Sequence, residues 1–525
     1  MAALGHWFGA AATTRLTLVV GVALLISSVL PPVGAGGPSD ARLAVDATAV
    51  MRRVDGRFFG LNATIWDAAF ATPETTALLA TAGTRVLRFP GGSLSDQYHW
   101  RTNTTLDNAW TWATGFDQFA PIAVALNAAV YITVNYGTGT PGEAAEWVTY
   151  ANVTNGYGFR YWEIGNENYG SWEADEQELP HDPYTYAVRA ADYMARMKAA
   201  DPTIRVGVVV ITGEDSFANN TRHPATNPRT GLVHNGWTPV LLSTLHSLGV
   251  TPDFAVYHRY EQTPGGESDA VLLQSARTWR EDAGDLRQQL GDYLGPAGAG
   301  VELVVTENNS VYASPGKQTT SLVNGLFLAD SVGNLLQTEF NALLWWDVRN
   351  GQEDGNNNRA ALYGWRQYGD YGVISTSSAF GSPTSYEPYP TYYAARLVSR
   401  WAAGGDTVVR AVSDHPWLSA FAVRGSDGSL RLLVINKSPD SALSATIELA
   451  GFEPAPSATA HSYGIPQDEA ARTGAGSPDI ATTTMAIPGA TFAATFGSYS
   501  ATVLVFQPAD PHRVPRRTLR RPETP

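Results

Sequence analysis

The run Tyr161-Trp162-Glu163-Ile164-Gly165-Asn166-Glu167 leads from apolar and aromatic residues into a polar, charged end. Aromatic and β-branched residues of this kind favour a short strand. Longer stretches with apolar residues at three- and four-residue spacing, such as 183–200 and 272–290, are typical of helices. Seven further strand-like runs alternate with such stretches, at residues 58–62, 85–91, 129–136, 206–210, 254–260, 302–307 and 342–347.

Strands that alternate with helices predict parallel β-α-β units. Eight such units predict an α/β fold in which the strands close into a (β/α)8 TIM barrel, here over residues 55–377. The alternative is a doubly wound open sheet. That fold would want a glycine-rich phosphate-binding turn after its first strand, and Gly60-Leu61-Asn62 does not provide one.

The pattern changes after residue 377, because short alternating runs separated by Gly, Pro, Asp and Ser occupy the chain as far as residue 508. This pattern predicts a C-terminal antiparallel β-sandwich. Residues 36–54 contain another strand-like stretch, and we expect it to join the sandwich rather than the barrel.

The two ends of the chain differ from its body. Residues 16–30 are almost continuously apolar but too few to span a bilayer comfortably, and Val33 and Ala35 fit the small-residue rule for cleavage. Residues 1–35 therefore predict a signal peptide and a secreted, extracellular protein, with a retained signal anchor as the alternative. The Arg- and Pro-rich residues 509–525 predict a disordered tail.

Composition excludes several classes of function. The 525 residues carry 35 basic and 49 acidic groups, a net charge of −14, which argues against a nucleic-acid partner. There is no Cys, so thiolate metal sites and Cys nucleophiles are excluded. The stretch 354–358 only partly fits a calcium loop, because Arg359 and Trp365 stand where Gly and Glu are needed. We expect no metal, no cofactor and, after signal cleavage, no membrane contact; nothing in the sequence specifies the oligomeric state.

Two glutamates stand at strand ends that face each other. Function in a (β/α)8 barrel lies at the C-terminal ends of the strands. Glu167 ends the fourth predicted strand and Glu307 the seventh, so both belong at the mouth of the barrel. Two carboxylates across a cleft are what cleavage of a glycosidic bond requires, since one protonates the leaving oxygen and the other attacks the sugar or activates water. The competing interpretation is that each is a solvated loop residue.

Other strand ends supply side chains suited to a sugar, with aromatic rings for its C–H face and polar groups for its hydroxyls. Glu163 should lie deeper in the barrel and pair with Arg88, whereas Asn166 alternates away from Glu167 and reaches the pocket only if the strand breaks its pleat. Tyr260 and His258 share a face and could orient Glu307. The candidate substrate-binding residues are Arg88, Asn135, Asn166, His258, Tyr260, Trp345 and Trp346, with core packing as the alternative for Trp345.

These motifs resemble the retaining glycoside hydrolases of clan A, whose (β/α)8 barrels end strand four in Asn-Glu and strand seven in Glu. The resemblance extends over residues 55–505 and implies that Glu167 is the acid/base, Glu307 the nucleophile and Asn166 the contact to the sugar's 2-hydroxyl. Arg88-Phe89-Pro90-Gly91-Gly92-Ser93 makes the chain most similar to family 51 α-L-arabinofuranosidases and their relatives. Their nucleophile is usually followed by Trp, whereas Asn308 follows Glu307 here, which leaves the sugar open.

Three functions follow from this sequence. The first is a secreted retaining α-L-arabinofuranosidase acting on polysaccharide or oligosaccharide by double displacement, with the two carboxylates about 5–5.5 Å apart rather than the 6.5–9.5 Å of inverting enzymes. The second is a member of the same clan with another sugar, such as a β-xylosidase, β-glucuronidase or endo-glucanase. The third is a carbohydrate-binding protein without catalysis, against which the presence of both Glu167 and Glu307 argues.

Overall fold

The computed structural model describes residues 40–105, 110–376 and 386–509. The predicted signal peptide, residues 1–35, lies outside these ranges, as does the predicted tail beyond residue 509. Within the described ranges no helix is both long and apolar enough to cross a membrane.

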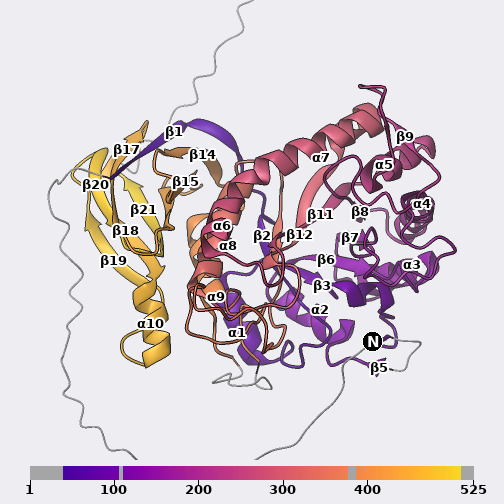
Figure 1. Ribbon diagram of the computed structural model, residues 1–525, viewed down its shortest axis with the longest axis horizontal. Coiled ribbons are helices and arrows are strands. Elements are labelled where there is room, and N and C mark those ends of the chain that lie inside the picture. The colour runs from indigo at the N-terminus through magenta and orange to yellow at the C-terminus, as the bar shows by residue number, and fades with distance from the viewer. Residues whose placement is uncertain (1–39, 106–109, 377–385, 510–525) are drawn as a thin grey trace, which may run out of the picture. The chain divides into compact units, whose positions relative to one another are not determined.

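Eight parallel strands close into a barrel, and each of the eight strand-like runs of the sequence supplies one of them (Figure 1). The predicted (β/α)8 fold is therefore confirmed. Around the barrel the order is β11-β12-β13-β2-β3-β6-β7-β8, so β13 closes the ring against β2. The strands are β2 (Phe59–Asn62), β3 (Val86–Phe89), β6 (Ala129–Val134), β7 (Tyr161–Ile164), β8 (Arg205–Val209), β11 (Phe254–Gln262), β12 (Glu302–Val311) and β13 (Leu343–Trp345).

A helix follows each barrel strand, and local sequence explains where several begin. Thr72, Thr140 and Asp182 each accept a hydrogen bond from a backbone N–H of the first turn, and proline follows each of them, where its missing N–H costs nothing. The helices are α1 (Pro73–Ala82), α2 (Phe116–Ala125), α3 (Pro141–Val148), α4 (Pro183–Ala200), α5 (Trp237–Ser247), α6 (Asp269–Ser275), α7 (Trp279–Leu294), α8 (Leu322–Leu335) and α9 (Pro390–Trp401).

Short elements lie in the connections of the barrel. They are the helical turns η1 (Ser93–Gln97), η2 (Thr149–Thr154), η3 (Ala276–Thr278) and η4 (Gly295–Gly300), and the two-residue strands β4 (Thr104–Thr105), β5 (Trp110–Thr111), β9 (Ala225–Thr226) and β10 (Val233–His234). The turn η1 matters most for the site, because it directly follows β3 at the mouth of the barrel.

Helix α9 extends the barrel beyond residue 377, where the sequence pattern placed its end. The helix packs against α8 on one side and α1 on the other, and so completes the ring of helices after β13. Its residues Tyr392, Leu397 and Val398 are buried. The last barrel helix thus begins at Pro390, and the first strand of the sheet to follow it begins at Thr407.

The rest of the chain forms a nine-stranded, mostly antiparallel sheet that matches the predicted β-sandwich (Figure 1). Its order is β19-β18-β21-β16-β15-β14-β1-β17-β20. Sequence analysis did not anticipate β20 or the helix α10, which joins β18 to β19. The elements are β1 (Ala41–Arg53), β14 (Thr407–Ser413), β15 (Leu418–Arg424), β16 (Leu430–Asn436), β17 (Leu443–Ala450), β18 (Pro454–Gly464), α10 (Ile465–Thr473), β19 (Ala481–Ala486), β20 (Thr491–Phe496) and β21 (Ser500–Pro508).

The strand β1 precedes the barrel in sequence but lies in this sheet, between β14 and β17. It pairs antiparallel with β14 and parallel with β17. In Figure 1 it is the indigo arrow among orange and yellow strands. The sheet also shares a core with the barrel, because Phe421, Leu433 and Val503 belong to the same buried cluster as residues of the barrel helices.

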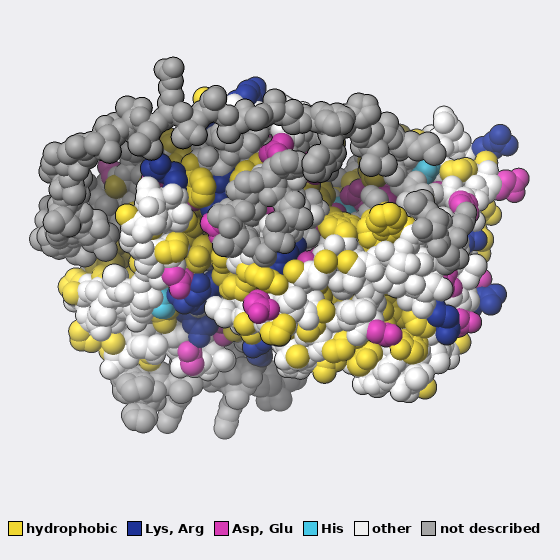
Figure 2. All heavy atoms as spheres, turned by 90° about the horizontal axis from the view of Figure 1, so that it is seen from below, with side chains coloured by type: hydrophobic (Ala, Val, Ile, Leu, Met, Phe, Trp, Pro, Cys, Tyr) yellow, Lys and Arg dark blue, Asp and Glu magenta, His cyan; other side chains and the backbone are white. Residues whose placement is uncertain are grey.

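Charged side chains are mixed rather than segregated on the face shown in Figure 2, where basic and acidic groups stand among apolar and neutral ones.

Candidate active site

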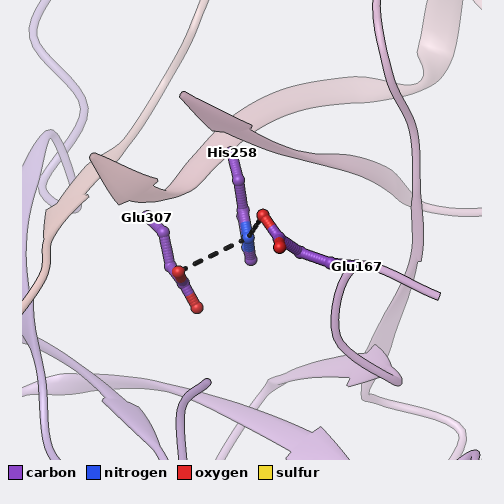
Figure 3. Close-up of side chains that lie close together, drawn as sticks. All are labelled: Glu167, His258 and Glu307. Carbon is purple, nitrogen blue, oxygen red and sulfur yellow. Dashed lines mark hydrogen bonds and ion pairs between the residues drawn. The ribbon is translucent and has the colours of Figure 1, made fainter. Parts of the chain in front are cut away.

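Glu167, His258 and Glu307 converge at the mouth of the barrel (Figure 3). Glu167 follows β7, His258 lies on β11 and Glu307 on β12. The Nδ1 atom of His258 is 3.0 Å from Oε1 of Glu167 and 3.6 Å from Oε2 of Glu307. One ligand atom from each of the three residues lies within 4.8 Å of the other two. The imidazole thus stands between two carboxylates that are 140 positions apart in the chain (307 − 167).

The end of β7 breaks its pleat, which brings Asn166 into the site. The strand ends at Ile164, Gly165 has φ = 72° and Glu167 has φ = 41°. A Cβ on Gly165 would lie 2.1 Å from Oδ1 of Asn168, so glycine is required there both for its φ and for space. Because two residues leave the extended conformation, the side chains of Asn166 and Glu167 both point into the barrel mouth instead of to opposite faces.

Glu167 is surrounded by hydrogen-bond donors. The hydroxyl of Tyr169 donates to its Oε1 at 3.0 Å, and the indole N–H of Trp172 donates to its Oε2 at 2.9 Å. Burial acts to raise the pKa of Glu167, but the hydrogen bond and charge of His258, together with Trp172 and Tyr169, outweigh it, and the pKa is lowered. These donors therefore stabilise the charged form of this carboxylate.

Glu307 is fixed by two neighbours from other strands. Nη1 of Arg88 donates to its Oε1 at 2.7 Å, and the hydroxyl of Tyr260 donates to its Oε2 at 2.7 Å. The guanidinium of Arg88 is fully buried and also donates to Oε2 of Glu163 at 2.7 Å and to Oδ1 of Asn166 at 2.8 Å. The buried guanidinium of Arg88 thus joins Glu163, Glu307 and Asn166 in a single hydrogen-bond network.

Two acids that sequence reasoning did not single out support this network. Asp96, in η1, accepts a hydrogen bond from the backbone N–H of Asn166 at 3.0 Å and others from the backbone N–H groups of Tyr136 and Gly137. Burial raises the pKa of Asp96 to about 7, although these hydrogen bonds oppose the change. Glu173 accepts from Nδ2 of Asn166 at 3.0 Å. Asp96 lies in a single helical turn and Glu173 in a loop, and both segments are too short for sequence periodicity to mark them.

The structure places five of the predicted substrate-binding residues beside the two glutamates and gives the other two different contacts. The five residues that surround the two glutamates or line the mouth beside them are Arg88, Asn166, His258, Tyr260 and Trp346. Trp346 packs against Trp66 and lies close to Tyr260.

Asn135 and Trp345 serve the fold instead. The side-chain amide of Asn135 forms hydrogen bonds within its own loop. Its Oδ1 accepts from the N–H groups of Thr138 and Gly139, and its Nδ2 donates to Oγ1 of Thr138. Trp345 is fully buried and packs against Phe327 of α8. Since neighbouring strand residues face opposite sides, Trp345 points to the helices where Trp346 points to the mouth.

Glu167, His258 and Glu307 are also the group of described residues whose ligand atoms are close enough together to hold a metal ion. In the structure these atoms contact one another and the donors of Tyr169, Trp172, Arg88 and Tyr260. The arrangement is that of two carboxylates bridged by an imidazole, which suits proton transfer and nucleophilic attack.

Comparison with known proteins places the chain among carbohydrate-active enzymes. No family model matches it. It is 24% identical over 432 residues to probable α-L-arabinofuranosidase C of Aspergillus clavatus, covering 70% of this chain and 76% of the relative. It is also 24% identical over 419 residues to α-L-arabinofuranosidase C of Emericella nidulans, covering 69% of this chain and 75% of the relative.

Solved structures share its fold. The α-L-arabinofuranosidase of Thermotoga maritima, in complex with arabinose, matches with a TM-score of 0.66 and 19% identity, over 89% of this chain and 99% of that one. CelM2, a bifunctional glucanase-xylanase from a metagenome library, matches with a TM-score of 0.62 and 19% identity, over 90% of this chain and 100% of that one.

The barrel with its attached sheet and the curated relatives define a glycosyl hydrolase. Within that class the chain is similar to the α-L-arabinofuranosidases, and the predicted resemblance to clan A glycoside hydrolases of the family 51 kind is confirmed.

Proposed function

We propose that this glycosyl hydrolase is a secreted enzyme that releases α-L-arabinofuranosyl units from polysaccharide or oligosaccharide with retention of configuration. The observation that carries the proposal is the convergence of Glu167 and Glu307 on His258, with one oxygen of each within 4.8 Å of the other. Retaining enzymes place their carboxyl groups about 5–5.5 Å apart, and inverting enzymes need about 6.5–9.5 Å to admit a water between them. The short separation supports retention.

In the first step the Glu307 carboxylate attacks the anomeric carbon as the bond to the leaving oxygen breaks, and the proton of Glu167 passes to that oxygen. The product is a glycosyl ester on Glu307. In the second step Glu167, now a carboxylate, takes a proton from water, whose oxygen attacks the anomeric carbon. The ester bond breaks, Glu307 leaves as a carboxylate and Glu167 is protonated again.

The contacts of the two glutamates support different roles for them. Arg88 donates to one oxygen of Glu307 and Tyr260 to the other, which fixes the direction of the carboxylate, as a nucleophile requires. Glu167 must be protonated to act as an acid, and its donors, with His258 foremost, lower its pKa. His258 links the two glutamates, because its Nδ1 lies 3.0 Å from Oε1 of Glu167 and 3.6 Å from Oε2 of Glu307.

The sugar is assigned by resemblance. The curated relatives carry the name α-L-arabinofuranosidase, and a matching structure was solved with arabinose. A second candidate is a glucanase or xylanase activity, favoured by the match to CelM2 and by Asn308, which follows Glu307 where family 51 usually has Trp.

A panel of nitrophenyl glycosides tests the reaction and the sugar together. We expect release from the α-L-arabinofuranoside, and proton NMR of the first product should show the same anomeric configuration as the substrate. Glu307→Gln should lower kcat by about 10⁴-fold or more, and Glu167→Gln by about 10²–10⁴-fold, least for the best leaving groups. The exposed Glu178 lies in the same loop region as Glu167, and Glu178→Gln serves as the matched control with unchanged turnover.

Unchanged turnover in Glu307→Gln would reject the roles assigned here. Release of product only from a xyloside, glucuronide or glucan would support the proposed reaction but would show that the substrate sugar is not arabinofuranose. Secretion is tested separately, by sequencing the N-terminus of the protein recovered from culture medium. A mature protein that begins just after Ala35 is the expected result, and an N-terminus that still includes residues 16–30 would indicate the retained anchor.

A further inference from the structure

Glu173 is a buried carboxylic acid beside the two glutamates, and the reaction described above does not use it. Its side chain is 5% exposed. Two consecutive turns place it, because the N–H of Gly170 donates to the carbonyl of Glu167 and the N–H of Glu173 donates to the carbonyl of Gly170. The loop that carries the rim glutamate therefore also fixes the position of Glu173.

The two oxygens of Glu173 have different surroundings. Oε1 accepts hydrogen bonds from Oγ of Ser93 at 2.8 Å and from Nδ2 of Asn166 at 3.0 Å. Oε2 is buried and has no hydrogen-bond partner among the described residues. A carboxylate would need donors at both oxygens, whereas a neutral acid carries its proton on the oxygen that receives none.

The charges around Glu173 favour the same form. Burial first, and then the nearby Asp96 and Glu167, raise its pKa well above the ordinary range. No cation forms an ion pair with it among the described residues. Asp96 receives hydrogen bonds at both of its oxygens and is the better site for a negative charge. The pair therefore keeps its proton on Glu173.

We propose that Glu173, as a neutral acid, is a positioning residue that sets the orientation of the Asn166 amide. Arg88 donates to Oδ1 of Asn166 at 2.8 Å, and Glu173 accepts from its Nδ2. A donor at one end and an acceptor at the other permit only one of the two amide orientations. The inference rests on the proposed function, together with the contact of Asn166 to the sugar's 2-hydroxyl that the resemblance to clan A implies.

The expected consequence is that Glu173 acts through Asn166, which a double-mutant cycle measures. Glu173→Ala should lower kcat/KM for the nitrophenyl arabinofuranoside by about 10–100-fold, since small misplacement of a substrate contact costs up to about 10². In the Asn166→Ala background the same change should cost less than about 2-fold, because the group it positions is gone. If Glu173 had only a structural role, Glu173→Ala would lower kcat/KM by the same factor in both backgrounds.

A conservative variant tests the charge state. Gln has the shape of a neutral glutamic acid and keeps an acceptor for Ser93 and Asn166, so Glu173→Gln should recover most of the kcat/KM lost in Glu173→Ala. The exposed Glu178, five residues along the loop (178 − 173), is the control, and Glu178→Ala should match the parent enzyme. Circular dichroism melting of every variant confirms that the compared proteins are folded.

Three results would overturn the inference: no effect of Glu173→Ala, equal losses in both backgrounds, or a Glu173→Gln variant as impaired as the alanine variant. These failures leave the proposed function standing. A parent enzyme that hydrolyses no glycoside would remove both, and the two kinds of failure are therefore distinguished by the parent's own activity.

Discussion

Arg88 connects the side chains of the site, because its fully buried guanidinium donates hydrogen bonds to Glu163, Glu307 and Asn166. Lysine keeps the charge but cannot provide a planar fork of donors. We expect Arg88→Lys to lower kcat by about 10²-fold or more and to reduce the free energy of unfolding by about 1–3 kcal/mol, because buried acceptors lose their partners. Steady-state kinetics and urea unfolding measure the two effects.

The control for this substitution is Arg101→Lys. Arg101 pairs with Glu146 at the surface, and both side chains are 63% exposed, so the change should alter stability by less than about 1 kcal/mol and leave turnover unchanged. An Arg88→Lys variant as active and as stable as Arg101→Lys would show that the network is not needed.

In the proposed mechanism, His258 sets the pH range in which Glu167 donates its proton. Against the effect of burial, its hydrogen bond and charge lower the pKa of Glu167, and an acid works only below its own pKa. The kcat/KM of the parent enzyme should therefore decline as pH rises through the lowered pKa. His258→Gln removes the positive partner, so the pKa should rise and this basic limb should move to higher pH. The pH profile of kcat/KM measures the shift, with His246→Gln, on the exposed surface of α5, as control. A limb that stays in place would contradict the coupling.

Sequence reasoning found the residues whose direction follows from a regular strand and missed those on irregular backbone. Glu167, Glu307 and Arg88 could be placed at one rim because parallel barrel strands end at the same face. The inward turn of Asn166 depends on positive φ at Gly165 and Glu167, which alternation does not reveal. Asp96 lies in a short helical turn and Glu173 in a loop. The hydrogen bonds of Asn135 to Thr138 depend on the conformation of their turn, which the sequence does not reveal.

At the scale of elements, the turn after β7 is the part on which the site depends most. Alanine at Gly165 would combine a positive φ with a Cβ placed 2.1 Å from Oδ1 of Asn168. We expect Gly165→Ala to cost about 1–3 kcal/mol in stability and to reduce kcat sharply, because relief of the clash moves Glu167. Gly158 separates the causes, since it has φ = 67° and no atom lies within 4 Å of the position that an added methyl group would take. Gly158→Ala should share the strain but keep kcat; equal kcat losses in both would contradict the steric argument.

Elements were predictable where periodicity was strong and less so where it was short. All eight barrel strands follow from β-branched and aromatic runs, as the closed sheet requires. The strand β20 has the sequence Thr-Phe-Ala-Ala-Thr-Phe over Thr491–Phe496, and this pattern is too short and too weak to distinguish from a loop. The partners of helix α9, which are α8 and α1, are set by tertiary packing, and for this reason its membership of the barrel could not be predicted from the sequence.

At the scale of the whole molecule, a buried ion pair joins sheet and barrel. Nζ of Lys437, just after β16, lies 3.1 Å from Oδ2 of Asp330 in α8, and both side chains are fully buried. Removal of one partner leaves the other charge buried without a counter-ion, so Lys437→Met should lower the free energy of unfolding by about 3–5 kcal/mol. The double variant Lys437→Met with Asp330→Leu should recover most of that loss.

Chemical denaturation followed by fluorescence measures these free energies. Disruption of the exposed pair Arg196–Asp192 on α4 should change stability by less than about 1 kcal/mol. A double variant no more stable than Lys437→Met would contradict the stranded-charge explanation. Because Phe421, Leu433 and Val503 share a core with the barrel helices, each variant should still unfold in a single transition.

The position of β1 has a consequence for how the chain matures on the ribosome. This strand is translated before the barrel, yet its partners β14 and β17 begin only at Thr407 and Leu443. At about 5–20 residues per second, its backbone waits on the order of 20 to 80 seconds for a neighbour. An unpaired edge of that duration invites association with other nascent chains, so newly made molecules should depend on chaperones far more than finished ones do.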